Sequence, residues 1–213
     1  RTPGRVNVFA THSEYTADID VDHASLHWRG QNFGYALSAA MLRSGPIPRT
    51  TELYAEGTGE TFDADQYVLS FSLARAMTDR FSVGVTAKYF QENLDEWEIR
   101  SALFDLGLLY FVGFGDLRIG FTVRNVGPDL RPGGTPPDLG GDHGTRSEFQ
   151  KHSPPTEGTF GAAKTWDLAG DVDLLTAADF NHPSDAAETL RLGGELGLWR
   201  LLYVRGGYEL GRD

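Results

Sequence analysis

The residues of this chain that could hold a metal ion are a few His and Asp side chains at short spacing. His23 and His27 share one side of a predicted strand. Four residues of strand separate them by about 13 Å, which is too far to chelate one ion. Asp18, Asp20 and Asp22 alternate onto one face and could attract Ca²⁺. A wet lumen or rim surface is the favoured interpretation of these three carboxylates.

Other candidate sites are equally weak. Asp138, Asp142 and His143 lie in a Pro/Gly-rich loop, for which solvated side chains are the simpler reading. The run Gly57–Gly59 lacks the Lys and the following helix of a phosphate-binding loop. Paired carboxylates on strands could act as acid and base, but ion pairs across a lumen are the stronger interpretation. We therefore predict no enzyme, no catalytic residue, no metal and no cofactor.

Composition removes several classes of protein. The chain has 213 residues, a net charge of −11, 26 Gly and no Cys. The acidic balance argues against a nucleic-acid partner, which requires a basic face. The lack of Cys excludes disulfides and thiolate zinc sites. No apolar run reaches the length of about 18–20 residues that a membrane helix needs.

The segments that must position the polar residues read as β-strands. Between Ala64 and Asn125, apolar residues alternate with small or charged ones over four successive runs, and a period of two is the signature of a strand with two unlike faces. Similar runs occur throughout the chain, which gives about eleven strands. In the second strand, the apolar side changes between Val21 and Ala24, and we predict a bulge near His23.

Connections between the predicted strands alternate between tight and longer. We expect connections at 12–16, 92–96 and 181–188, and long ones at about 44–63 and 125–157. In an up-and-down sheet, alternate connections emerge at the same end, so the long ones would share one rim. That asymmetry is typical of outer-membrane barrels.

Charge also segregates. Ten charged residues fall on the strand face opposite the apolar stripe, and half of them are basic: Lys88, Asp105, Arg118, Arg124, Asp173, Asp179, Arg191, Glu195, Arg205 and Glu209. Because a charge facing hydrocarbon is costly, we predict that these residues face a lumen and pair with one another. There are four exceptions. Arg75 lies beside a tight turn, where it could reach lipid headgroups. Glu98 and Arg100 lie at the loop end of their strand, and for Lys164 the pattern offers no explanation.

Three runs of the sequence resemble the PorV/PorQ family of bacterial outer-membrane proteins. They are SFSLARAMTDRFSVGVTAKYF, FDLGLLYFVGFGDLRIGFTVRNVGPDL and LRLGGELGLWRLLYVRGGYELGRD, at 70–90, 104–130 and 190–213. The resemblance implies a single antiparallel, up-and-down transmembrane β-barrel of the FadL-like kind over 1–213. It also implies a leader and first segment before Arg1, and closing strands after Asp213.

In the family's namesake branch, such barrels bind secreted cargo for the type IX secretion system. The resemblance therefore implies an outer-membrane scaffold with the lipid bilayer, cargo proteins and secretion machinery as partners. We place the partner contacts on the two long loops, with these candidate residues: Arg49, Glu52, Tyr54, Arg131, Asp138, Arg146 and Phe149. The alternatives are a FadL-like transporter of hydrophobic small molecules and a soluble, secreted β-domain.

Overall fold

The computed structural model describes residues 5–134 and 149–211. Within these ranges the regular structure consists of strands, and no helix is long and apolar enough to span a bilayer. Eleven strands form one sheet in which neighbours in sequence are neighbours in space, apart from a small hairpin inserted after the third strand. Every pairing is antiparallel. The predicted all-β, antiparallel, up-and-down fold of about eleven strands is confirmed.

The strands are long, between nine and fifteen residues in the main sheet. The first half of the chain contains β1 (Arg5–Tyr15), β2 (Ile19–Arg29), β3 (Phe33–Arg43), β4 (Ile47–Pro48), β5 (Thr61–Phe62), β6 (Ala64–Ala76) and β7 (Phe81–Leu94). The second half contains β8 (Trp97–Phe111), β9 (Arg118–Val126), β10 (Glu157–Ala169), β11 (Val172–Pro183), β12 (Thr189–Leu198) and β13 (Leu202–Leu210).

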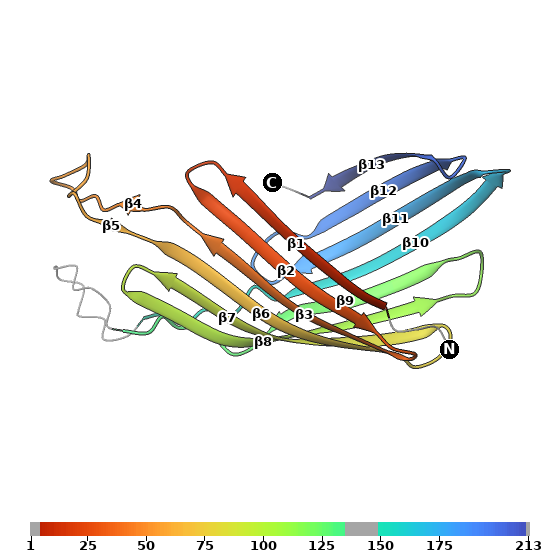
Figure 1. Ribbon diagram of the computed structural model, residues 1–213, viewed down its shortest axis with the longest axis horizontal. Coiled ribbons are helices and arrows are strands. Elements are labelled where there is room, and N and C mark those ends of the chain that lie inside the picture. The colour runs from red at the N-terminus through yellow and green to blue at the C-terminus, as the bar shows by residue number, and fades with distance from the viewer. Residues whose placement is uncertain (1–4, 135–148, 212–213) are drawn as a thin grey trace.

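The sheet is bent into an open trough (Figure 1). The strands β1–β3 form one wall, β11–β13 form the other, and β7–β9 lie along the lower side. Among the described residues, β1 and β13 each pair with a single neighbouring strand, so both edges of the sheet are free.

The connections sort onto two rims, less regularly than predicted. One rim, here called the long-loop rim, carries 44–63 and 127–156; the other, the short-turn rim, carries only connections of two to six residues. Two connections of the long-loop rim are nevertheless tight, because β1 continues to Tyr15 and β7 to Leu94. The expected loose connections at 12–16 and 92–96 are therefore wrong. Residues with positive φ, Ala17, Asp18 and Asp95, make these tight turns possible.

The register separates two faces. The apolar face contains the cross-strand row Val8, Leu26, Leu37, Phe71, Ala87 and Phe104. One residue along each strand, the polar face contains the row Asn7, His27, Ala36, Ser72, Thr86 and Asp105. Successive side chains of a strand point to opposite sides, so this alternation follows directly from the sequence pattern.

The apolar face has no packed core beneath it. Phe71 and Phe104 are 51% and 55% exposed, and the described residues include only two buried large hydrophobic side chains, Leu103 and Leu130. Contiguous exposed apolar surface on this scale marks a face that meets a partner or a membrane.

The predicted bulge near His23 is absent. β2 pairs with β1 and β3 without a shift of register, so Ile19 and Val21 lie on the polar face while Asp22 lies on the apolar face. The reason is that the apolar face becomes polar close to the long-loop rim, where Arg43 donates a hydrogen bond to Asp22. The register instead shifts between Phe104 and Leu106 and between Asp167 and Ala169.

Candidate functional site

The polar face holds all ten charged residues that the sequence pattern assigned to a lumen. Successive cross-strand pairs place them on one side of the sheet, from Lys88 on β7 to Glu209 on β13. Seven of them take part in ion pairs with residues of the same face: Lys88, Asp105, Arg124, Arg191, Glu195, Arg205 and Glu209. Among the described residues, Arg118, Asp173 and Asp179 have no ion pair.

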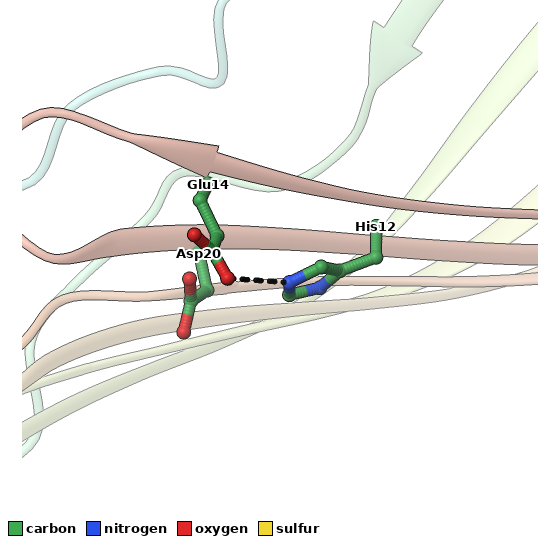
Figure 2. A group of neighbouring side chains, drawn as sticks. All are labelled: His12, Glu14 and Asp20. Atoms are coloured by element: carbon green, nitrogen blue, oxygen red, sulfur yellow. Dashed lines mark ion pairs between the residues drawn. The ribbon is translucent and has the colours of Figure 1, made fainter.

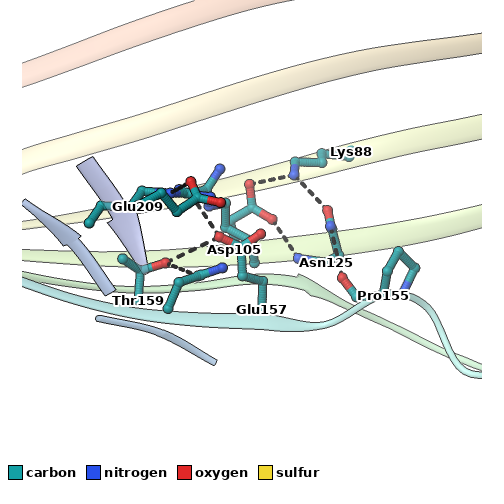
Figure 3. Close-up of polar contacts among 10 residues, drawn as sticks. Lys88, Asp105, Asn125, Pro155, Glu157, Thr159 and Glu209 are labelled. Atoms are coloured by element: carbon teal, nitrogen blue, oxygen red, sulfur yellow. Dashed lines mark hydrogen bonds and ion pairs between the residues drawn. The ribbon is translucent and has the colours of Figure 1, made fainter. Parts of the chain in front are cut away.

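A compact polar cluster lies where β7, β8 and β9 meet (Figure 3). Lys88 Nζ is 2.7 Å from Asp105 Oδ2 and donates a hydrogen bond of 2.9 Å to Asn125 Oδ1. Asp105 in turn accepts the backbone N–H of Asn125 at 2.9 Å. Lys88 and Asp105 are only 18% and 17% exposed. Each charge therefore has its partner within hydrogen-bonding distance in a largely shielded position.

Asn125 is the backbone feature that makes this cluster possible. Its φ is +58°, and the β8–β9 register shift lies beside it. Asn tolerates the left-handed conformation better than most residues. The side-chain amide of Asn125 also donates to the carbonyl of Pro155, which fixes the chain entering β10. This bulge could not be predicted from the sequence, because Asn125 stands only at the end of an alternating run.

The cluster continues onto β10 and β11 through a residue that the sequence reasoning missed. Glu157 pairs with Arg124 at 3.2 Å and accepts a hydrogen bond from Thr159, which also donates to Asn181. Glu157 opens β10. Because Glu157 stands at the junction of the long loop and a strand, the sequence did not show to which face of the sheet its side chain belongs. The strand-face pattern of Thr159 and Gly161 could have revealed it.

Two more ion pairs cross β12 and β13. Arg191 donates to Glu209 at 2.7 Å, and Arg205 donates to Glu195. Asp179 lies beside Gly161, where a Cβ atom would be 2.0 Å from its carboxylate oxygen. The glycine thus leaves room for the Asp179 side chain. Most of these charged residues are thus held in cation–carboxylate pairs, an arrangement that suits a structural surface better than a reactive site.

In the first long loop, Arg49 holds the chain against the β7–β8 turn. Arg49 donates a hydrogen bond of 2.6 Å to Asp95, in the β7–β8 turn, and lies 3.4 Å from Glu60. The bond to Asp95 raises the pKa of the Arg49 guanidinium above its usual value. β4 and β5 pair next to it as a two-stranded sheet. Glu52 and Tyr54, at the tip, are exposed.

The second long loop is described at its two ends. Leu130 and His152 form an isolated β-bridge, and the N–H of Gly133 donates to the carbonyl of Glu98. The rings of Phe149 and Trp97 pack edge to face, with 5.8 Å between the ring centres. Of the candidate loop residues, Arg131 follows this bridge directly, whereas Asp138 and Arg146 lie outside the described residues.

The acidic row of β2 belongs to an exposed cluster at the long-loop rim. His12 Nδ1 is 2.7 Å from Asp22, and His12 Nε2 is 3.5 Å from Glu14. Figure 2 shows Asp20 close to both, with candidate ligand atoms of His12, Glu14 and Asp20 within 4.8 Å of one another. His12 and Glu14 are exposed, Asp20 is half-buried, and His12 already pairs with Glu14 and Asp22, so we assign no metal site to this cluster. Asp18, predicted with them, lies in the β1–β2 turn.

The apolar face also contains a groove of about 730 Å³. Its floor is a row of alanines contributed by β1, β2 and β3: Ala10, Ala24 and Ala39. Larger side chains border it, including Met41 and Leu69. The groove exists because three small residues lie side by side on a face that otherwise bears large ones.

Comparisons with known proteins add little. No family model matches the chain, and no curated protein matches it. Among solved structures it is similar to a CymD monoaromatic hydrocarbon channel, with 12% sequence identity and a TM-score of 0.40. The superposition covers 98% of this chain and 82% of that one. A likeness of this quality does not establish a function, and the fold described above rests on the strand register of this chain.

Proposed function

We propose that this chain is the wall of a bacterial outer-membrane β-barrel, with its apolar face toward lipid and its polar face toward the lumen. The observation that carries this proposal is the combination of exposed side chains such as Phe71 and Phe104 on one face with paired charges on the other. A soluble domain would bury such a face against its own residues. In a bilayer the face is covered by hydrocarbon, and charges remain on the lumen side.

Within this setting we favour a scaffold whose long-loop rim docks secreted proteins or their partners, in the manner of the PorV/PorQ family. Two features support this role. Four cations of the polar face, Lys88, Arg124, Arg191 and Arg205, are paired with carboxylates of the same face, so their charge is not free to select a solute. The two long connections, 44–63 and 127–156, lie on the same rim, and both are fastened to the β7–β8 region.

Membrane insertion is tested with the full-length protein. We expect it to remain in the membrane fraction without detergent, and to migrate differently on a gel before and after boiling, because a closed barrel resists unfolding by detergent. Release of folded protein without detergent would instead support the soluble β-domain and reject both membrane roles.

Docking is tested at the tip of the first long loop. The double substitution Glu52→Ala/Tyr54→Ala removes two exposed side chains without touching Arg49, which holds the loop. We expect binding of cargo C-terminal signal domains to weaken at least tenfold, the size of effect that exposed aromatic contacts can have at interfaces. Met77→Ala, an exposed residue of the short-turn rim, is the matched control. Equal binding by all three proteins would exclude this loop.

A second candidate function is the passage of hydrophobic small molecules between the bilayer and the barrel. The groove over Ala39 favours it, because the groove lies on the face that we place against lipid. Its volume of about 730 Å³ falls within the range of small-molecule sites, and its lining is apolar. Filling the groove with Ala39→Phe should abolish uptake of a hydrophobic tracer such as toluene by cells that carry the protein. Unchanged uptake would reject this function and leave the scaffold role standing.

A further inference from the structure

The cations of the apolar face have different partners at the two rims. Near the long-loop rim, Arg43 donates to Asp22 at 2.9 Å, and Arg100 lies 2.7 Å from Glu98. Near the short-turn rim, Arg75 and Lys164 have aromatic rings as their neighbours instead. Neither has a carboxylate partner within the described part of the chain. Among the described residues, this second pair of cations therefore has no counter-ion.

Lys164 is held in an aromatic corner. Its Nζ is 3.6 Å from the ring centre of Trp166 and 4.9 Å from that of Phe114, in the β8–β9 turn. Trp166 is fixed in turn, because its indole N–H donates to Thr176 at 3.0 Å. Gly115 adds to the fit, since a Cβ atom there would lie 3.0 Å from Lys164 Cε. This geometry accounts for a lysine that the strand pattern left unexplained.

Arg75, near the end of β6, has the same kind of environment. Its guanidinium carbon is 5.1 Å from the ring centre of Phe33. Phe33 stacks on Tyr35, and Tyr35 stacks on Trp28 at 5.3 Å between ring centres. Aromatic rings attract a cation through their electron-rich faces, but they do not neutralise it. An anion from outside the chain would complete the site.

The opposite rim would repel that anion. Its part of the apolar face contains five carboxylates: Glu14, Asp20, Asp22, Asp65 and Glu98. Among the described strand residues of this part of the face, the positively charged or titratable basic ones are Arg43, Arg100, His12 and His182. The apolar face thus has cations and aromatic rings at the short-turn rim and an excess of carboxylates at the long-loop rim. This distribution is complementary to a membrane whose anionic headgroups lie at the short-turn rim.

We propose that Arg75 and Lys164 bind the phosphate groups of anionic phospholipids in the leaflet at the short-turn rim. The inference rests on the proposed membrane barrel and specifies which lipid contacts it, at which end. The aromatic neighbours Phe33 and Trp166 would lie against the upper acyl chain, while the cations reach the phosphate. At each position the cation thus binds the lipid phosphate and the aromatic ring contacts the acyl chain.

The experiment uses the full-length protein in phosphatidylcholine vesicles containing either dibrominated phosphatidylglycerol or dibrominated phosphatidylcholine. Bromine quenches tryptophan fluorescence on contact. Trp166 lies beside Lys164, and Trp28 is linked to Arg75 through the stacked rings of Tyr35 and Phe33. We expect a preference for phosphatidylglycerol that falls about fivefold for each of Arg75→Met and Lys164→Met, the effect of one cation near a charged membrane surface. Met keeps a long apolar side chain at each place.

The matched control is Arg43→Met/Arg100→Met, which removes two paired cations from the same face and should leave the preference unchanged. An equal loss in this control, or no preference in the native protein, overturns the lipid assignment. Displacement by free inorganic phosphate would assign the site to a soluble anion and overturn it as well. Failure of the protein to insert at all would reject the proposed barrel, which is a distinguishable result.

Discussion

Lys88, Asp105 and Asn125 show how single residues set the polar face. Lys88 contacts a carboxylate and an amide on two neighbouring strands, and both partners are largely shielded from water. A shielded ion that loses its partner costs more than the pair contributes. The loss of stability on removing one member of this cluster therefore comes mainly from the charge that is left without its partner.

We expect Lys88→Met to destabilise the folded protein by about 1–3 kcal/mol. It leaves the Asp105 carboxylate without its cation, with only the Asn125 N–H as donor, and removes the donor of the Asn125 side-chain carbonyl. Urea unfolding in vesicles measures the shift of midpoint. The double variant Lys88→Met/Asp105→Leu should recover most of the loss. Arg205→Met, whose side chain is mostly exposed, should change stability much less. Equal effects of both single variants would show that shielding is unimportant here.

At the scale of the strand, glycines decide how closely segments approach. Gly127 follows β9, at a place where a Cβ atom would lie 2.7 Å from the carbonyl oxygen of Ala102 on β8. Backbone atoms cannot move aside as a flexible side chain can. Gly34, on β3, has no heavy atom within 4 Å of the corresponding position. A side chain at position 127 would therefore collide with the backbone of β8, whereas one at position 34 would meet open space.

Gly127→Ala should lower the free energy of unfolding by about 1–3 kcal/mol, the range for overpacking a close contact. It should also increase hydrogen exchange of the backbone amides in β9, because the chain after Val126 must shift. Gly34→Ala should be close to neutral. Comparable losses for both variants would mean that general strand propensity, rather than the approach to Ala102, governs the effect.

At the scale of the whole molecule, the identity of the two faces determines the environment of the sheet. Leu37 and Ala36 are adjacent on β3, but Leu37 belongs to the exposed apolar face and Ala36 to the polar face. A solvent-exposed position accepts a charge readily, whereas a lipid-facing one does not. The same substitution at these two residues therefore discriminates between water and lipid.

For a membrane barrel, Leu37→Arg should reduce folding stability in vesicles by about 2–4 kcal/mol, as expected for Arg near the middle of the bilayer. Ala36→Arg should have a smaller effect, since it adds a charge to the lumen side. The measurement is reversible unfolding followed by tryptophan fluorescence. A harmless Leu37→Arg would indicate that this face meets water.

The sequence by itself determined the strands and their two faces. A period of two in runs such as Phe81–Tyr89 fixes side-chain direction through local backbone geometry alone. For this reason the eleven strands, their order and the common face of the ten charges could be predicted. The lengths of the turns after Tyr15 and Leu94 could not, because a polar strand end resembles a loop in sequence.

Only the tertiary structure decided which residues meet. Register between strands is a non-local property, so the sequence could not show that Lys88 faces Asp105 and Asn125, or that Glu157 joins Arg124. It equally could not show Lys164 against Phe114, because Phe114 lies in the β8–β9 turn, far from Lys164 in sequence. Alternation sets the side of the sheet for each residue, and pairing across strands sets its partner.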